Sequence, residues 1–371
     1  MATDTAIEWT HCPGYKGKSW NPVTGCTKIA QGCKHCYAET LAKRFWKDRA
    51  FTDVQTHADR LDEPLRRRLK TCYFVNSMSD LFHEAVPFEF IAAVYGVMAA
   101  CPQHLFIILT KRPKRMREFF EWLADKAKEG TLRTDWLHGE GVLLSDYGRV
   151  LLPNFPDRLQ TSSRPWPLPN VIHGYSAANQ ADLDAGIADL LATPSTLRCL
   201  SLEPLIGPVD LRQHLHDFGC PCGWGGDSPD AKCHECGWIG SDLVVEGLCP
   251  HCSQPLDDTD VCPECKLDSR DGAGFGPNED GRPDWVIVGG ESGPGPGVRP
   301  CDIAWIRSIV SQCKAADVPC FVKQFGANPY QAPRHDGDTG FELGLRDRKG
   351  ADPAEWPEDL RVREFPEVGN G

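Results

Sequence analysis

No apolar run in the 371-residue sequence approaches twenty residues, and its amino-terminal stretch lacks the apolar centre of a signal peptide. A helix that spans a bilayer needs about 20 consecutive apolar residues, so we expect no membrane association and a cytoplasmic location. Basic residues are also few relative to acidic ones, 40 against 52, which gives a formal net charge of −12. This balance argues against a protein that coats nucleic acid by bulk electrostatic attraction.

Cysteine, by contrast, is abundant, with 18 residues in the chain. Since no signal peptide is found, we expect a reducing compartment, where closely spaced cysteines are metal ligands more often than disulfide partners. With 41% apolar residues the chain is long enough to bury a full core. We therefore expect one large domain with an insert.

The charge is distributed unevenly along the chain. Residues 1–70 carry 13 basic and 8 acidic side chains, a net of +5, which leaves −17 for the remainder. This predicts a local basic face, although a solvated helix surface explains any single member equally well. The basic residues concerned are Lys43, Arg44, Lys47, Arg49, Arg66, Arg67, Arg68 and Lys70.

Short apolar runs alternate with polar turns and helix-like stretches, which is the pattern of a parallel sheet. We therefore predict an α/β fold, a partial or full (β/α) barrel, with a doubly wound open sheet as the alternative. A further strand is expected before Cys26. The apolar runs are Cys72–Val75, Leu105–Leu109, Val171–Gly174, Leu197–Leu202, Trp285–Val288 and Cys320–Val322.

Polar or charged residues follow each of these runs. Because the carboxyl ends of barrel strands converge on one mouth, we expect these side chains to line one cavity. Taken singly, each is more often a turn former or a helix cap. The stretches are Asn76–Asp80, Thr110–Arg112, Tyr175–Ser176, Glu203–Pro204, Gly289–Ser292 and Lys323–Gln324.

Two segments interrupt the alternation. Residues 131–168 have no clear period and are predicted to form a loop or lid insertion. Residues 214–283 are rich in cysteine, glycine and aspartate and are predicted to form an inserted module. The barrel would then comprise residues 1–213 and 284–330, with 331–371 as a carboxyl-terminal extension to which we assign no role.

Three cysteines near the start, Cys26, Cys33 and Cys36, have the spacing C-x6-C-x2-C and precede a helix-like stretch. Three thiolates on one loop can hold three irons of a 4Fe–4S cluster and leave the fourth iron open. S-adenosylmethionine (SAM) can chelate that iron, which places its sulfonium for one-electron cleavage to a 5′-deoxyadenosyl radical. The alternatives are a Cys3His zinc site with His35 or His11, or ordinary buried thiols.

Several stretches around these cysteines resemble the phage-associated three-cysteine-motif family, often encoded beside a three-Cys-motif partner protein. The resemblance implies a radical-SAM-like barrel with a 4Fe–4S cluster, although the six-residue first gap departs from the three-residue gap usual in radical SAM enzymes. The matching stretches are Trp20–Cys26, Gly32–Glu39, Asn76–Phe82, Leu109–Pro113, Ser201–Pro204 and Val288–Ser292.

The resemblance also implies roles for residues at the predicted mouth. In radical SAM barrels a short motif after the second strand binds the SAM amino group, and Asn76, Ser77 and Asp80 occupy that place, with Ser176 as a further cofactor contact. Lys111 and Arg112 are candidates to bind a carboxylate or phosphate, or are simply surface charges. The candidate catalytic residues at the mouth are Lys111, Glu203 and Glu291.

The insert contains the spacing of a zinc ribbon, Cys233-x2-Cys236-x12-Cys249-x2-Cys252. Four more cysteines suffice for a second site, so we expect one or two Zn²⁺ ions, with the pairing of the ligands left open. The module is polar, so metal binding would provide most of its folding free energy. The second set of cysteines is Cys220, Cys222, Cys262 and Cys265.

These features predict a radical SAM enzyme that acts on a nucleic-acid component, in repair or modification of DNA. A peptide or small metabolite is the alternative substrate, and a non-catalytic zinc protein that docks nucleic acid or a partner is the alternative of a different class. The expected partners are nucleic acid, an electron donor and the three-Cys-motif partner protein.

Overall fold

The structure is a computed structural model that describes residues 5–129, 167–215, 282–293, 297–333 and 340–368. The predicted lid, 131–168, and the predicted zinc-ribbon module, 214–283, lie almost entirely outside the described residues. The same holds for all eight cysteines assigned to zinc.

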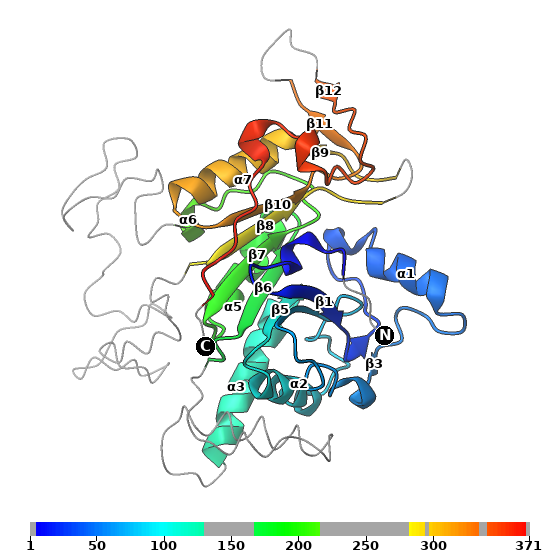
Figure 1. The fold of residues 1–371 in the computed structure, drawn as a ribbon, viewed down its shortest axis with the longest axis vertical. Coiled ribbons are helices and arrows are strands. Elements are labelled where there is room, and N and C mark those ends of the chain that lie inside the picture. Colours follow the sequence, from blue (N-terminus) through cyan, green and yellow to red (C-terminus); the bar gives the residue numbers. More distant parts are fainter. Residues whose placement is uncertain (1–4, 130–166, 216–281, 294–296, 334–339, 369–371) are drawn as a thin grey trace, which may run out of the picture.

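A seven-stranded parallel sheet forms the centre of the molecule and curls into a partial barrel (Figure 1). Its strands follow one another in chain order without reversal, which excludes the doubly wound alternative. Each predicted apolar run coincides with one of these strands, and the strand expected before Cys26 is β1. In spatial order they are β1 (Lys16–Trp20), β4 (Thr71–Val75), β5 (Leu105–Thr110), β6 (Val171–Ala177), β7 (Leu197–Leu202), β8 (Trp285–Gly289) and β10 (Cys320–Gln324).

Helices follow most of the strands. Two of the longer ones begin at a side-chain cap, because Asn179 accepts a hydrogen bond from Asp182 N and Asp302 accepts one from Ala304 N. None of the described helices is long and apolar enough to cross a membrane. The α-helices are α1 (Tyr37–Phe45), α2 (Phe88–Ala100), α3 (Pro113–Glu129), α5 (Gln180–Leu191), α6 (Arg212–Leu215) and α7 (Ile303–Ala315); the short 3₁₀ turns are η1 (Glu8–Thr10), η2 (Gln31–Cys33), η3 (Ala58–Arg60), η6 (Pro353–Glu355) and η7 (Glu358–Leu360).

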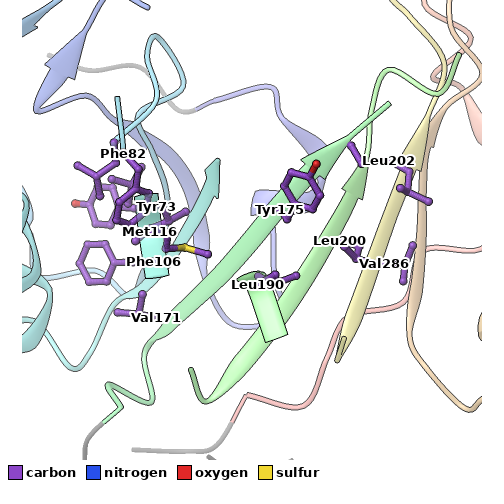
Figure 2. Packing of buried hydrophobic residues seen from close by; sticks show 14 of the residues in the cluster. Tyr73, Phe82, Phe106, Met116, Val171, Tyr175, Leu190, Leu200, Leu202 and Val286 are labelled. Atoms are coloured by element: carbon purple, nitrogen blue, oxygen red, sulfur yellow. The ribbon is translucent and has the colours of Figure 1, made fainter. Parts of the chain in front are cut away.

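Apolar side chains fill both faces of the sheet, because successive residues of a strand point to opposite sides. Tyr73, Phe106 and Val171 face the helices and pack with Met116 of α3 (Figure 2). The alternate residues form a second cluster on the concave face. This inner cluster includes Trp9, Cys12, Cys72, Phe74, Leu105, Ile107, Ile172, Cys199, Trp285, Ile287 and Phe321.

The amino-terminal turn η1 lies across the opening between the two edge strands, since it contacts both β1 and β10. Its Trp9 is 2% exposed and meets the Phe74 ring edge-on, with ring centroids 4.8 Å apart. The concave face is therefore a packed core at this level, which directs attention to the carboxyl ends of the strands.

The carboxyl-terminal extension covers the outer edge of β10. Val322 N donates to Val362 O at 2.9 Å, and Glu364 N donates to Cys320 O at 2.9 Å. These bonds satisfy backbone groups that an open edge strand would expose. Two small sheets complete the fold: β2 (Val23–Thr24) pairs with β3 (Gln55–Thr56), and β11 (Pro329–Gln331) joins β9 (Cys301–Asp302) and β12 (Phe341–Glu342).

Candidate functional site

The alternation that fills the inner core also places charged residues at the carboxyl mouth of the barrel. Leu105 and Ile107 belong to the inner cluster, and residues two apart on a strand point to the same face of the sheet. Lys111, just past the end of β5, is therefore on the inner side as well. By the same step of two, Ser176 follows Ile172 and Glu203 follows Cys199. The position of these residues at the mouth thus follows from the alternation of side chains along each strand.

The loop that carries the three cysteines is fastened to the turn after β4. A parallel bridge joins Gly25 to Ser79, and Gly25 N donates to Met78 O at 3.1 Å. On the far side of the cysteines, Tyr37 of α1 donates its hydroxyl to Ser77 O at 2.6 Å. The turn predicted to bind the cofactor therefore also holds the cysteine loop in place.

Gly25, directly before Cys26, has a φ of +94°, and a Cβ placed there would lie 2.4 Å from Asp53 O. Gly14 has a similar φ of +82° but open space around it. Gly25→Ala is therefore expected to lower the free energy of unfolding by clearly more than Gly14→Ala, which carries only the left-handed penalty of about 1–2 kcal/mol. Urea unfolding of both variants measures this difference, and equal losses would contradict the close approach.

Arg112 connects Cys26 to the barrel. Its guanidinium donates to Cys26 Sγ at 3.7 Å, to Thr27 O at 3.2 Å and to Asp80 Oδ2 at 3.1 Å. A further ion pair joins it to Glu84 at 2.9 Å. Arg112 is 5% exposed, so this fixed cation sits beside a thiol at the mouth of the barrel.

Asp80 accepts hydrogen bonds on both carboxylate oxygens. Oδ1 accepts from Phe82 N at 3.0 Å and Thr110 Oγ1 at 2.8 Å, and Oδ2 accepts from Lys111 N at 3.0 Å as well as from Arg112. A ligand ammonium that approached Asp80 would have to replace one of these donors. In the described residues Asp80 thus positions Arg112 and the end of β5.

Asn76 lies at the end of β4 with a φ of +62° and is 2% exposed. Its Oδ1 accepts from Val23 N at 3.1 Å. Its Nδ2 is buried and has no hydrogen-bond partner among the described residues. A buried amide donor without a partner is costly, and an acceptor atom of a bound ligand would satisfy it.

Across the mouth, polar contacts involve the ends of four strands, β5, β6, β7 and β10. Lys111 Nζ donates to Ser176 Oγ at 2.9 Å and to Ser176 O at 3.0 Å. Lys323 Nζ on β10 and Glu203 Oε1 after β7 form an ion pair past the end of β8, which lies between these two strands. Burial lowers the pKa of Lys111, while Cys33 and nearby carboxylates oppose this effect.

Glu291 closes the mouth on the side of β8. Its carboxylate is bound by the Arg299 guanidinium and by Arg299 N at 2.8 Å, and it lies 2.9 Å from His35 Nδ1 in the cysteine loop. Burial alone would raise the pKa of Glu291, but the bonds from Arg299 and His35 outweigh it and lower that pKa to about 2. Arg299 also donates to Gln31 O at 2.9 Å, so Glu291 is tied into the loop.

The three thiols are free and partly buried, and Cys33 lies near enough to Cys26 and Cys36 to affect the pKa of each. Burial raises the pKa of Cys26 to about 11, with Asp80 and Cys33 adding to it and Arg112 opposing it. Burial also raises the pKa of Cys36, and Cys33 again contributes. Such thiols are poor nucleophiles at neutral pH, whereas metal binding removes a thiol proton outright.

We tested whether these residues fit a metal centre. Within the described part of the chain, no three His, Cys, Asp or Glu side chains are grouped closely enough to hold a metal ion. The chemistry of the donor set nevertheless fits an iron–sulfur cluster, because three free thiols share one loop that is clamped to the barrel mouth. His35, the alternative zinc ligand, contacts Glu291 through Nδ1, which leaves its Nε2 for the Cys3His zinc site as the alternative.

The structure thus brings most of the predicted site residues to one mouth: Cys26, Cys33, Cys36, Asn76, Ser77, Asp80, Lys111, Ser176, Glu203 and Glu291. Sequence reasoning did not assign a role to Arg299 or to Lys323. Lys323 has the same signal as the others, a charged residue at a strand end. Arg299 has none, because it lies outside the strands and reaches the site only through the loop after β8.

Comparison with known proteins gave one family. A family model described as "Protein of unknown function (DUF5131)" matches residues 4–350. No curated protein and no solved structure matches the chain.

Proposed function

Because the chain belongs to the DUF5131 family, whose description assigns no activity, we propose a function from the site itself. The protein is a radical SAM enzyme that holds a 4Fe–4S cluster on Cys26, Cys33 and Cys36 and acts on a nucleic-acid component, in repair or modification of DNA. It would then be one of the phage-associated three-cysteine-motif proteins that its sequence resembles.

One observation carries this proposal. Three free thiols lie on one loop, and that loop is hydrogen-bonded to the turn after β4, at the end of the barrel where charged residues follow the apolar inner cluster. When bound, the cluster would supply one electron to SAM, whose reductive cleavage gives a 5′-deoxyadenosyl radical. The fixed charges at this mouth suit the binding of a charged ligand such as SAM.

The chain's own residues would hold and orient the bound SAM. Asn76 Nδ2, buried without a partner, would donate to an acceptor on it. In this proposal the turn Asn76–Asp80 orients SAM, with Asp80 accepting from its amino group in place of one of the donors that it now has and still retaining Arg112. Lys111, which donates to Ser176, lies where it would pair with the ligand carboxylate.

Glu203 and Glu291 have different surroundings and hence different proposed roles. Glu203 is paired with Lys323 at the strand ends and faces the mouth, so it is the candidate proton carrier. Glu291 is held ionised by Arg299 and His35 and would position the cysteine loop. Both carboxylates belong to the same mouth of the barrel.

Anaerobic purification followed by a SAM-cleavage assay tests the proposal. We expect a brown protein that contains iron and sulfide and releases 5′-deoxyadenosine when a reductant and SAM are added. A colourless protein that holds only zinc and leaves SAM intact would contradict it and favour the non-catalytic zinc protein. Hydrogen-atom transfer to a peptide or metabolite, with none to nucleic acid, would favour the alternative substrate class.

A further inference from the structure

Helix α1 presents its bulky apolar residues to solvent. Tyr37, Leu41 and Phe45 recur every four residues along one face and are 48%, 38% and 66% exposed. The buried residues of the helix are only Ala38 and Ala42. A surface helix normally turns its large apolar side chains toward the core, so the reversed arrangement marks a surface that binds something.

Positive charge is concentrated around this helix. Residues 28–49 carry six basic and two acidic side chains in a chain whose formal net charge is −12. Such a local field favours a negatively charged partner. The basic residues are Lys28, Lys34, Lys43, Arg44, Lys47 and Arg49.

Two of these cations are paired with aromatic rings. Arg44 Cζ lies 5.3 Å from the centre of the Phe45 ring, and Arg49 Cζ lies 4.3 Å from that of Trp46. Arg49 is also bound to Asp53 and to Thr24 O, so Arg44 and the exposed Phe45 ring are the pair that offers charge to phosphates and a stacking face to bases, which is the pattern of single-strand binding. An acidic protein surface would use the Phe45 ring only if it also carried an apolar pocket to receive it, whereas every base of a single strand presents a face on which the ring can stack.

The stripe begins at the mouth of the barrel. Cys36 is the N-cap residue of α1, and the Tyr37 hydroxyl is bonded to Ser77 O in the turn after β4. Figure 1 shows α1 at the margin of the molecule, away from α2, α3, α5 and α7. A strand lying along Phe45, Leu41 and Tyr37 would therefore run toward the three cysteines.

We infer that α1, with Tyr37, Leu41, Phe45 and the flanking cations, binds a single-stranded segment of nucleic acid and leads it to the mouth. The inference narrows the substrate class to single strands or to nucleotides turned out of a duplex. That the bound strand is led to the mouth rests on the proposed function, whereas its binding to α1 does not.

Fluorescence anisotropy with the full chain and a labelled single-stranded oligonucleotide of about 16 nucleotides tests this inference. Phe45→Ala is expected to raise Kd about fivefold or more, because a stacking ring is lost. Arg44→Glu with Lys47→Glu is expected to weaken binding and flatten the dependence of log Kd on log salt. Phe341→Ala is the matched control, since Phe341 is 58% exposed but lies on β12 at another part of the molecule.

Four results would overturn the inference that α1 binds single strands. Unchanged Kd in Phe45→Ala, equal binding of a duplex with the same sequence, or no binding at all would overturn the inference. A loss of self-association in Phe45→Ala without loss of oligonucleotide binding would make the stripe an interface between two copies and also overturn it. Intact, Phe45-dependent binding in a protein that does not cleave SAM would refute the proposed function and leave this inference standing.

Discussion

Alanine in place of Cys26, Cys33 or Cys36 is expected to abolish cluster binding and SAM cleavage. Each thiol would hold one iron, and the described mouth offers no free fourth thiol that could replace it. Iron and sulfide content, the visible spectrum and 5′-deoxyadenosine release measure the loss. Retention of iron and activity in all three variants would refute the cluster assignment.

Two controls separate this effect from a general loss of cysteine. Cys12→Ala removes a thiol from the inner cluster, where it lies 3.7 Å from Cys72 Sγ, and should leave iron content unchanged. Changing Cys233 and Cys236 to Ser should lower zinc content while iron persists, because ribbon spacing closes a tetrahedral site by itself. Unchanged zinc in that double variant would remove the zinc-ribbon hypothesis.

Asp80→Ala is expected to lower the free energy of unfolding by about 3–5 kcal/mol, since removing one partner of a buried ion pair leaves the other charge poorly compensated. The side chains of Asp80 and Arg112 are 7% and 4% exposed. Glu84→Ala is the matched control, because Glu84 pairs with the same guanidinium but is 63% exposed. An exposed pair contributes about 0–1 kcal/mol, and urea unfolding compares the two variants.

The same variants test the role of Asp80 toward SAM. If Asp80 also binds the amino group, folded and cluster-loaded Asp80→Ala should bind SAM roughly tenfold or more weakly, since a charge-assisted hydrogen bond contributes about 1.5–3 kcal/mol. Glu84→Ala should bind SAM as tightly as the parent. Equal stability of the two variants would contradict the buried clamp, and equal SAM affinity would assign Asp80 to positioning alone.

Six strands of the main sheet were predictable because each is a short apolar run whose two faces are both buried, a signal that survives without any knowledge of contacts; β1, Lys-Gly-Lys-Ser-Trp, has no such run and was expected only from its place before Cys26. The mouth residues followed from the alternation of side chains, since Lys111, Ser176 and Glu203 each lie an even number of positions after an inner residue of the same strand. The cysteine motif was visible from its spacing alone. What spacing does not reveal is whether the three sulfurs converge on one centre.

The contacts that hold the site together could not be read from the sequence. His35 and Glu291 are 256 positions apart, and Asp80 shares Arg112 with Cys26 only because the β4 turn and the cysteine loop meet. Similarly, the amino-terminal turn fills the barrel interior with Trp9, a contact that no local pattern encodes. Such pairings depend on how distant strands are placed, which is a property of the whole sheet.

Helix α1 shows most clearly which features the sequence determines and which depend on the tertiary structure. Its sequence determined the helix and the shared face of Leu41 and Phe45, because residues four apart lie one turn above each other. Only the tertiary structure decided that this face points to solvent while Ala38 and Ala42 point inward. Periodicity specifies which side of a helix is apolar, whereas the position of the helix on the barrel determines what that side meets.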